Sequence, residues 1–348
     1  MTATIQTQLH TFLTDNLTDY LALLQEWVGI NSFTANKAGV DELGRKTAGS
    51  FAELGFAAEY IPSVHPGFGH HLVLTRPGKS GRKIGLVSHL DTVFPRAEER
   101  GNNFAWRPDG ERIYGPGTVD IKGGTLIIYM MLAALQATLP DVLDDITWII
   151  LLDASEEVAG ADFGELCVAR LGPEALACLI FEGGALQEGE AKVVVARKGM
   201  AIFHIEVAGK AAHAGSAHNT GANAILQLAD VLQQVGRLTD YERNLTFNVG
   251  TITGGTVTNR VPHFAAAKVE MRAYAPEVYQ AGVESIMALN EWSTVASVEG
   301  DFSCQVSVTQ TRKTLPWPRN AATDHLFFCG RKPGRRWGWP LCLRSAAA

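Results

Sequence analysis

The chain has 348 residues, a formal net charge of −6, and 46% hydrophobic against 19% charged residues. This length suffices for two domains with sizeable cores, and the acidic balance excludes a basic surface for nucleic acid, so a small-molecule substrate is the better expectation. No membrane partner is expected, because the longest uncharged apolar stretch, Leu126–Leu135, is too short to span a bilayer.

The N-terminal segment, Met1–Gln25, is predicted to form an amphipathic helix. It lacks the basic start and apolar centre of a secretory signal. The five cysteines are odd in number and form no CxxC pair, which is typical of unpaired thiols in a reducing compartment. The sequence therefore predicts a cytoplasmic protein.

Three short apolar runs, separated by helical stretches, follow in the first half of the chain. They are Ile84–Ser88, Ile146–Asp153 and Cys178–Phe181. Near-continuous apolar strands alternating with helices are typical of an α/β fold, here a mainly parallel sheet flanked by helices. Ligands of such sheets bind at the carboxyl ends of the strands, and side chains that can bind metal follow all three runs.

A different pattern begins near residue 197. Predicted strands at Ile202–Val207, Thr246–Thr253, Ala265–Arg272 and Gln305–Thr309 are separated by helices at about Ala222–Gly236 and Glu277–Asn290. The order strand-helix-strand-strand-helix-strand predicts an inserted α+β (ferredoxin-like) domain. We therefore expect a catalytic domain at residues 1–196, an inserted domain at 197–314, and an incomplete return to the catalytic domain at 315–348.

The first candidate metal ligands are His89 and Asp120. His89 and Asp91 are two residues apart, so in an extended segment their side chains share a face, and Asp91 can accept the proton of one imidazole nitrogen while the other nitrogen binds metal. Asp120 stands in a glycine-rich turn before a helix, where small residues let the backbone crowd an ion. The alternatives are a buried histidine satisfied by Asp91, and a helix-capping aspartate at position 120.

Carboxylates complete the candidate site. Of the neighbours Glu156 and Glu157, one can bind metal while the other moves a proton during amide hydrolysis. Adjacent glutamates are more often a solvated helix start, but these two follow a strongly apolar strand. Zinc accepts imidazole and carboxylate ligands. Asp120, Glu157 and Glu182 supply three negative charges against the four positive charges of two zinc ions, and a shared hydroxide supplies the fourth.

The motifs Ser88–Val93, Gly115–Gly124 and Asp153–Glu157 together resemble the dinuclear zinc exopeptidase family. That family includes glutamate carboxypeptidase, acetylornithine deacetylase and succinyl-diaminopimelate desuccinylase, and the motifs are most similar to the glutamate carboxypeptidase branch. The similarity covers about residues 80–310. It implies that the chain has the family's two-domain architecture.

The resemblance also implies a role for each candidate residue. His89, Asp120 and Glu182 would hold one zinc ion and Asp120 and Glu157 the other, with Co²⁺ or Mn²⁺ as possible substitutes. Glu156 would be the general acid-base. The implied activity is that of a carboxypeptidase or N-acyl-amino-acid deacylase, which hydrolyses an amide bond next to a free carboxylate in a small peptide or N-acyl amino acid.

The inserted domain carries part of the same resemblance. His213 resembles a histidine that in many members reaches into the site of the partner subunit and stabilises the oxyanion. Asn259 and Arg272 resemble positions that bind the carboxylate of the substrate, a task suited to a guanidinium group. The similarity implies a homodimer formed through this domain.

One part of the family pattern is expected to be missing. Family members carry a further histidine ligand of the second zinc near the C-terminus, and His325, the one histidine beyond the inserted domain, is not expected to replace it. Residues 329–348 switch abruptly to glycine, arginine, proline and tryptophan, which resembles translation in a shifted frame, with a basic-aromatic binding segment as the alternative. The competing hypothesis is therefore a truncated, degenerate and catalytically impaired family member.

Overall fold

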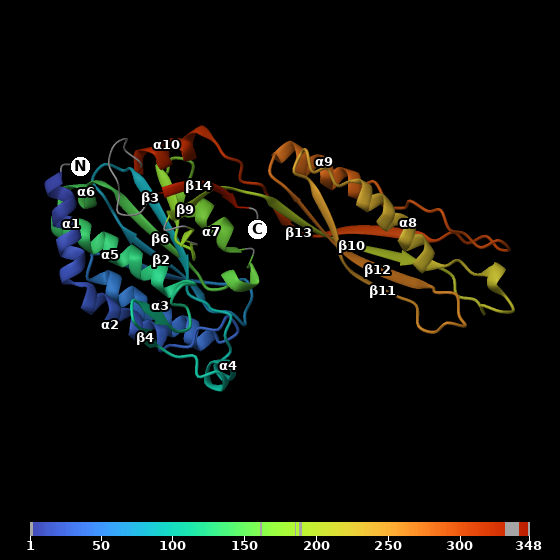
Figure 1. Ribbon diagram of the computed structural model, residues 1–348, viewed down its shortest axis with the longest axis horizontal. Coiled ribbons are helices and arrows are strands. Elements are labelled where there is room, and N and C mark those ends of the chain that lie inside the picture. The colour runs from blue at the N-terminus through green and yellow to red at the C-terminus, as the bar shows by residue number, and fades with distance from the viewer. Residues whose placement is uncertain (1–2, 161, 185, 188–189, 331–340, 347–348) are drawn as a thin grey trace. The chain divides into compact units, whose positions relative to one another are not determined.

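The computed structural model describes residues 3–160, 162–184, 186–187, 190–330 and 341–346 (Figure 1). The chain divides into two compact units, residues 1–183 (unit 1) and residues 184–348 (unit 2). The three functional segments expected from the sequence, 1–196, 197–314 and 315–348, stay a prediction. Most of the unusual tail, residues 331–340 and 347–348, lies outside the described residues.

Unit 1 combines helices with one five-stranded sheet and a two-stranded hairpin. Its helices are α1 (Ala3–Asp15), α2 (Leu17–Val28), α3 (Lys37–Ala52), α4 (Arg96–Gly101), α5 (Lys122–Thr138), α6 (Pro140–Asp145) and α7 (Asp162–Leu171), with a short 3₁₀ turn, η1 (Glu156–Val158). Its strands are β1 (Ala57–Pro62), β2 (His70–Arg76), β3 (Lys83–His89), β4 (Arg107–Asp109), β5 (Arg112–Tyr114), β6 (Thr147–Asp153) and β7 (Ala177–Ile180).

The N-terminal segment forms two helices where the sequence predicted one. The first ends at Asp15 and the second begins at Leu17, and the side-chain amide of Asn16 donates a hydrogen bond to the carbonyl of Phe12. An asparagine that bonds to the backbone of the preceding turn competes with the regular helical pattern, which accounts for a break at this residue.

The five-stranded sheet has the order β1-β2-β6-β3-β7. β6, β3 and β7 are parallel neighbours, whereas β1 and β2 are attached antiparallel at one side. The fold class is therefore confirmed, as a mixed sheet with a parallel part. His89 pairs with Asp153 in the register of β3 and β6, so these two strands end level with each other. This level edge is where side chains that follow the strands can meet.

Alternate residues of the sheet point to opposite faces and build two separate cores. One face packs against α2, α3 and α5, which cover it in Figure 1, and the other packs against α7. The first core contains Leu72, Leu74, Leu86, Ile150 and Leu152, and the second contains Val73, Ile149, Leu151, Phe163 and Leu171. Since full burial of one such side chain stabilises a fold by about 1.5–3 kcal/mol, the strands are fixed firmly beneath the edge that carries the candidate site.

Unit 2 contains the predicted α+β domain. Its elements are β8 (Leu186–Gln187), β9 (Glu190–Arg197), β10 (Gly199–Ala208), the 3₁₀ turn η2 (His218–Thr220), α8 (Ala224–Arg237), β11 (Thr246–Gly254), β12 (Phe264–Ala273), α9 (Pro276–Met287), β13 (Gln305–Thr314), α10 (Ala321–Gly330) and β14 (Leu341–Ala346). β10 to β13 form an antiparallel sheet of order β11-β12-β10-β13. With helices after the first and third strands, this is the ferredoxin-like arrangement.

The core of this antiparallel sheet lies on one face, beneath α8 and α9. β10 alternates strictly between buried and less buried residues, and Phe203, Ile205 and Val207 are fully buried. β9 pairs with β14 in parallel and with β8 antiparallel in a separate three-stranded sheet. None of the helices in the described part of the chain has the length and apolar character that a bilayer crossing requires.

Candidate metal centre

His89 is the last residue of β3 and is buried at the level edge of the sheet. Its side chain is 1% exposed. The Nδ1 atom lies 3.0 Å from the backbone oxygen of Asp91 and 3.3 Å from Asp91 Oδ1, while Nε2 lies 2.9 Å from Asp120 Oδ1. One ring nitrogen is therefore held within its own segment, and the other faces the carboxylate of a different loop.

Asp120 belongs to a tight turn that leads into α5. Gly117 has a φ of +77°, and a Cβ atom there would lie 3.0 Å from the stem of Lys122, so this position requires glycine. A Cβ on Gly123 would lie 2.2 Å from the carbonyl oxygen of Thr118. The glycine-rich sequence thus allows the close packing that holds Asp120 beside His89. The Asp120 side chain itself is 59% exposed, so one side of it remains open.

Glu182 comes from the segment that follows β7. Its Oε1 atom lies 3.7 Å from His89 Nε2. His89, Asp120 and Glu182 each offer one ligand atom, and these atoms all lie within 4.8 Å of one another. An imidazole nitrogen and two carboxylate oxygens around one point are a donor set that suits zinc and other divalent ions. In the described part of the chain, these three residues form a group that could hold one ion.

The electrostatics of this group favour a positive charge. Burial alone would lower the pKa of His89, yet hydrogen bonds to Asp120 and Asp91 and the charge of Glu182 raise it to about 11. The hydrogen bond with His89 in turn lowers the pKa of Asp120. The negative potential that holds a proton on the imidazole also attracts a metal cation. The ligand atoms and the local charge therefore both favour binding of a divalent ion.

Asp91 connects the imidazole to the loop that carries the two glutamates. It is fully buried, and its Oδ1 and Oδ2 atoms accept hydrogen bonds from the backbone N–H groups of Glu156 and Glu157 at 3.1 and 3.3 Å. Thr34 donates a third hydrogen bond to Oδ2 at 2.7 Å. One carboxylate therefore orients the imidazole and fixes the start of η1 at the same time.

Glu156 and Glu157 lie in η1, just beyond the end of β6, and face the same region. Partial burial and the charge of Asp120 raise the pKa of Glu157 to about 7. Partial burial also raises the pKa of Glu156, against the opposing charge of His89. The side chain of Glu157 is not a member of the three-residue group around His89, although it lies near enough to Asp120 for their charges to interact.

The other three predicted residues lie in unit 2. His213 is exposed, and its Nδ1 atom accepts hydrogen bonds from the N–H groups of Gly215 and Ser216, both at 3.1 Å. The neutral ring therefore carries its proton on Nε2 and can act as a donor there. Ala214 N–H bonds to the carbonyl of Asn259 at 2.9 Å, so the segments of His213 and Asn259 run side by side.

Arg272 lies at the other end of the antiparallel sheet. It is near the last residue of β12, pairs with Met200 of β10, and its Nε atom lies 2.7 Å from Glu270 Oε1. Phe264, the first residue of β12, is eight residue steps away. At about 3.3 Å per residue, these ends are roughly 26 Å apart. Ala208, the last residue of β10, pairs with Phe264, and the chain continues from Ala208 to His213. His213 therefore follows the end of the sheet that carries Phe264, and Arg272 lies at the opposite end.

Sequence patterns did not single out three residues that shape the site of unit 1. Thr34 anchors Asp91, and Lys122, which is 2% exposed, donates a hydrogen bond of 2.7 Å to the carbonyl of Ile30. Burial lowers the pKa of this lysine to about 8. His71 binds both ends of the glutamate loop, as described below. The position of Lys122, two residues after Asp120 in a glycine-rich turn, was a signal that the sequence offered. Thr34 and His71 gave no such signal, because their partners Asp91 and Asp162 are distant in sequence.

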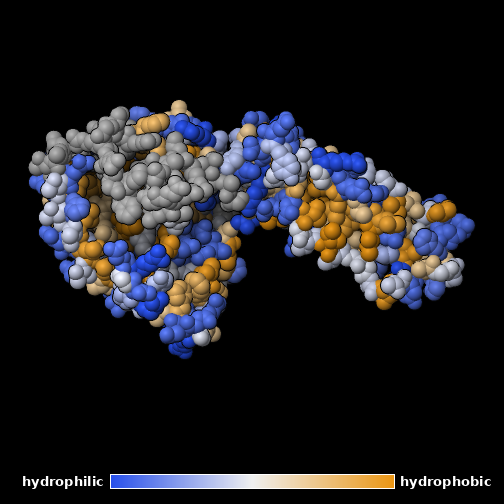
Figure 2. Space-filling view, in the orientation of Figure 1, coloured by the Kyte–Doolittle hydropathy of each residue, from blue (hydrophilic) through white to orange (hydrophobic). Residues whose placement is uncertain are grey.

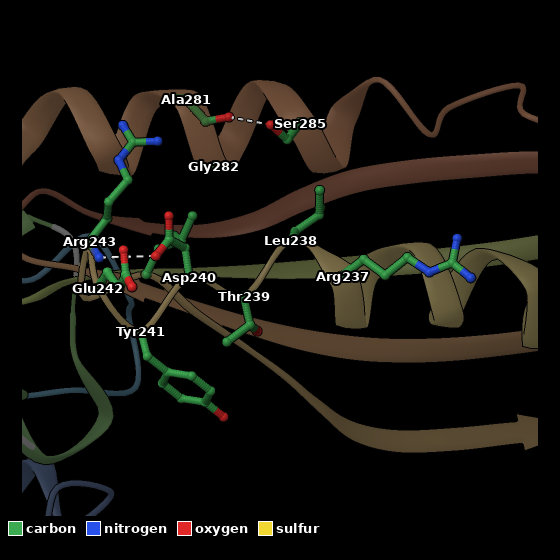
Figure 3. A pocket seen from close by; sticks show the side chains of 11 residues that line it. Arg237, Leu238, Thr239, Asp240, Tyr241, Glu242, Arg243, Ala281, Gly282 and Ser285 are labelled. Atoms are coloured by element: carbon green, nitrogen blue, oxygen red, sulfur yellow. Dashed lines mark hydrogen bonds between the residues drawn. The ribbon is translucent and has the colours of Figure 1, made fainter.

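A separate pocket of about 710 Å³ lies in unit 2 and contains none of the predicted residues. It is lined by the turn from Arg237 to Arg243 and by Ala281, Gly282 and Ser285 of α9 (Figure 3). Within it, Arg243 N–H bonds to Asp240 and the Ser285 hydroxyl bonds to Ala281. The first bond lies within the turn and the second within α9.

Comparison with known proteins finds relatives among the peptidases. Residues 195–294 match the peptidase dimerisation domain family. Carboxypeptidase G2 from Pseudomonas sp. (strain RS-16) is 27% identical over 273 residues, which cover 78% of this chain and 64% of that protein. A probable carboxypeptidase from Arthroderma gypseum is 32% identical over 216 residues, which cover 57% of this chain and 45% of that protein.

Solved structures share the fold. Aminopeptidase PepT from Bacillus cereus ATCC 10987 superposes with a TM-score of 0.74 at 23% identity, over 94% of this chain and 84% of that one. The M20 family metallo-carboxypeptidase Sso-CP2 from Sulfolobus solfataricus gives a TM-score of 0.60 at 16% identity, over 85% of this chain and 78% of that one. The chain is thus similar to M20 peptidases, because residues 195–294 match the dimerisation domain and the fold is shared with these solved structures. It spans 64% and 45% of the lengths of the two curated relatives named above.

Proposed function

We propose that the protein is a metal-dependent hydrolase of the carboxypeptidase or N-acyl-amino-acid deacylase type, which cleaves an amide bond next to a free carboxylate. The observation that carries this proposal is the meeting of His89, Asp120 and Glu182 at the edge of the sheet, with ligand atoms within 4.8 Å of one another. The carboxypeptidases among its relatives support the choice of reaction.

His89, Asp120 and Glu182 would hold one ion, and Asp120 and Glu157 would hold a second. Zinc suits this mixture of imidazole and carboxylate, and cobalt or manganese could replace it. When bound, the metal supplies Lewis-acid chemistry, which polarises the scissile carbonyl and makes a water molecule acidic. Asp91 keeps the imidazole of His89 in the orientation that turns Nε2 toward the ligand group.

Glu156 is the general acid-base of this proposal. It is exposed to solvent, adjoins Glu157, and its backbone is fixed by Asp91, so its carboxylate is anchored without being a member of the ligand group. A pKa raised above the ordinary glutamate value by partial burial suits a group that accepts a proton from water and later gives it to the leaving amine. The two adjacent glutamates thus divide the work between metal binding and proton transfer.

Recognition of the substrate is assigned to unit 2. Arg272 and Asn259 would bind the free carboxylate, and His213 would donate its Nε2 proton to the oxyanion. Because His213 follows the end of the sheet marked by Phe264, and Arg272 lies roughly 26 Å from Phe264 by the strand rise, one copy of unit 2 cannot bring both to a small substrate. We therefore propose a homodimer in which each substrate meets Arg272 of one subunit and His213 of its partner.

Two surface features of unit 2 support dimerisation. β11 is an edge strand of the four-stranded sheet, with Ile252 62% exposed. Figure 2 shows hydrophobic side chains gathered over α8, where Ile225 and Leu226 are 40% and 57% exposed. An exposed apolar helix face beside an open sheet edge is typical of a surface that another chain covers.

Purified full-length protein, loaded with zinc, tests the proposal. We expect hydrolysis of N-acyl amino acids or dipeptides with a free C-terminal carboxylate, and a much slower reaction with the same compounds amidated at that carboxylate. Metal analysis decides between the enzyme and the degenerate relative. About two ions per chain together with turnover support the hydrolase, whereas at most one ion and no turnover on either substrate set reject it.

A further inference from the structure

His71 is a buried imidazole held between two carboxylates. Its side chain is 1% exposed, Nδ1 lies 3.2 Å from Asp153 Oδ1, and Nε2 lies 3.0 Å from Asp162 Oδ2. The N–H group of Ala154 also points at Nδ1, at 3.1 Å. His71 sits in β2 on the face of the sheet that packs against α7, and its ring lies 5.4 Å from that of Phe163.

The two carboxylates mark the two ends of the loop that carries the glutamate pair. Asp153 is the last residue of β6, Asp162 is the first residue of α7, and η1 with Glu156 lies between them. Asp153 also accepts hydrogen bonds from the N–H and hydroxyl groups of Ser155, at 2.8 and 3.2 Å. One imidazole thus ties together the points where the chain leaves the sheet and where it enters the helix.

The loop between these ends needs an external restraint. Ala159 has a φ of +53°, a left-handed conformation that is costly for a residue with a Cβ atom and persists only when its surroundings enforce it. On the side of the metal centre, Asp91 holds the N–H groups of Glu156 and Glu157. Within the loop, Gly160 N–H bonds to the carbonyl of Ser155 at 3.2 Å. On the side of α7, His71 and the N–H group of Val64, which donates to Asp162 at 2.8 Å, hold the ends of the loop.

We propose that His71 is a positioning residue for Glu156, which acts by clamping Asp153 and Asp162 at the two ends of the glutamate loop. The inference rests on the proposed function for the role of Glu156, but not for the clamp itself. The polar partners of His71 are Asp153, Ala154 and Asp162, and neither glutamate is among them, so it acts through the loop and not on the substrate. A histidine suits this task because Nε2 can donate to Asp162 while Nδ1 accepts from the N–H group of Ala154, the residue that follows Asp153.

The test compares His71→Ala with His70→Ala in the full-length protein. His70 is the matched control, because it is the preceding residue of β2 and binds a different aspartate, Asp41, at 3.0 Å. Hydrogen exchange of the segment 154–163 is measured without metal and with zinc, and steady-state kinetics are measured on the zinc-loaded protein. Asp162→Asn, which weakens only the Nε2 side, serves as a second variant if His71→Ala does not fold.

We expect His71→Ala to exchange faster in 154–163 while α2 and α3 keep their protection, and kcat to fall about tenfold to a hundredfold with little change in KM, as for a misplaced catalytic group. In His71→Asn, the shorter amide side chain can replace the Nδ1 contact next to Asp153. This variant should recover part of the exchange protection and part of kcat. Unchanged exchange in 154–163, an equal loss in His70→Ala, or loss of protection throughout unit 1 would each overturn the clamp. If the wild-type protein hydrolyses nothing, the proposed function fails, while the exchange experiment still decides the clamp.

Discussion

The Nε2 atom of His89 lies 2.9 Å from Oδ1 of Asp120, although the two residues are 31 positions apart in the chain. β3 delivers the imidazole, and the glycine-rich turn before α5 delivers the carboxylate. Ser88 and Thr125 share a hydrogen bond of 2.9 Å that joins the end of β3 to the first turn of α5. This contact keeps both halves of the ligand pair in register.

Replacing Asp120 by alanine should remove most of the bound metal. Asp120 is proposed to serve both ions, so its loss takes a ligand from each, and we expect the metal content to fall from about two to below one per chain. The measurement is metal analysis after gel filtration. Asp109→Ala is the control, since Asp109 lies on the exposed β4–β5 hairpin and pairs with Arg107. Equal metal content in Asp120→Ala and the wild-type protein would exclude the assigned role.

Glu156→Gln should abolish turnover while leaving the metal in place. The amide cannot accept a proton from water, and general acid-base groups contribute about 10²–10⁴-fold to the rate. Glu157→Gln should differ, because a proposed ligand is lost and metal content falls with activity. The check is kcat together with metal content for both variants. Loss of metal in Glu156→Gln to the same extent as in Glu157→Gln would contradict the division of roles.

Arg272→Ala should weaken substrate binding more than it slows chemistry. A guanidinium that pairs with a carboxylate contributes about 1.5–3 kcal/mol, which corresponds to an increase in KM of about tenfold or more. Arg312→Ala is the control, because Arg312 is exposed on strand β13 of the same sheet, with β10 between it and β12. Steady-state kinetics with carboxylate substrates provide the measurement, and an unchanged KM in Arg272→Ala would argue against this binding role.

Leu226→Asp should separate the proposed dimer. Leu226 is 57% exposed on α8, so a charge there costs little in the isolated chain but would be buried in an interface that covers this helix. The molar mass by light scattering should fall from that of two chains to that of one. Leu176→Asp in unit 1, at a side chain that is 55% exposed, is the control and should leave the mass unchanged. If Leu226→Asp is still a dimer, the interface does not cover this face of α8.

Asp162 should make the protein sensitive to acid. Burial alone would raise its pKa, but hydrogen bonds from His71 and from the N–H of Val64 lower it to about 2 from an ordinary value of 3.8. A carboxyl group with a depressed folded-state pKa stabilises the fold above its unfolded pKa, and this stability is lost as the pH falls from about 4 toward 2.

The matched variant for this prediction is Asp162→Asn. It should be less stable than wild type by about 2 kcal/mol near pH 6, with the difference shrinking toward zero near pH 2. Urea unfolding followed by circular dichroism at several pH values measures it. A difference that stays constant from pH 6 to pH 2 would show that the charge of Asp162 does not stabilise the fold.

The sequence by itself determined the elements and the candidate residues. Short apolar runs specified β3 and β6, because strands buried on both faces need nearly continuous apolar side chains. A similar run specified β7, although this strand is mostly exposed, and strict alternation specified β10. The residues at the ends of those strands were visible for the same reason, since a parallel sheet places its ligands there. The same patterns could not reveal the break at Asn16 or the antiparallel attachment of β1 and β2, which depend on local capping and on strand pairing.

Only the tertiary structure decided which of these residues meet. His89, Asp120 and Glu182 converge because three separate segments end at one edge, whereas His213 and Arg272 are separated by the length of β12. The partners of Asp91 and His71 also emerged only there, because hydrogen bonds between Thr34 and Asp91 or between His71 and Asp162 join residues 57 and 91 positions apart. Local patterns record which face a side chain occupies, but the distance between two distant segments is set by packing, and no single segment carries that information.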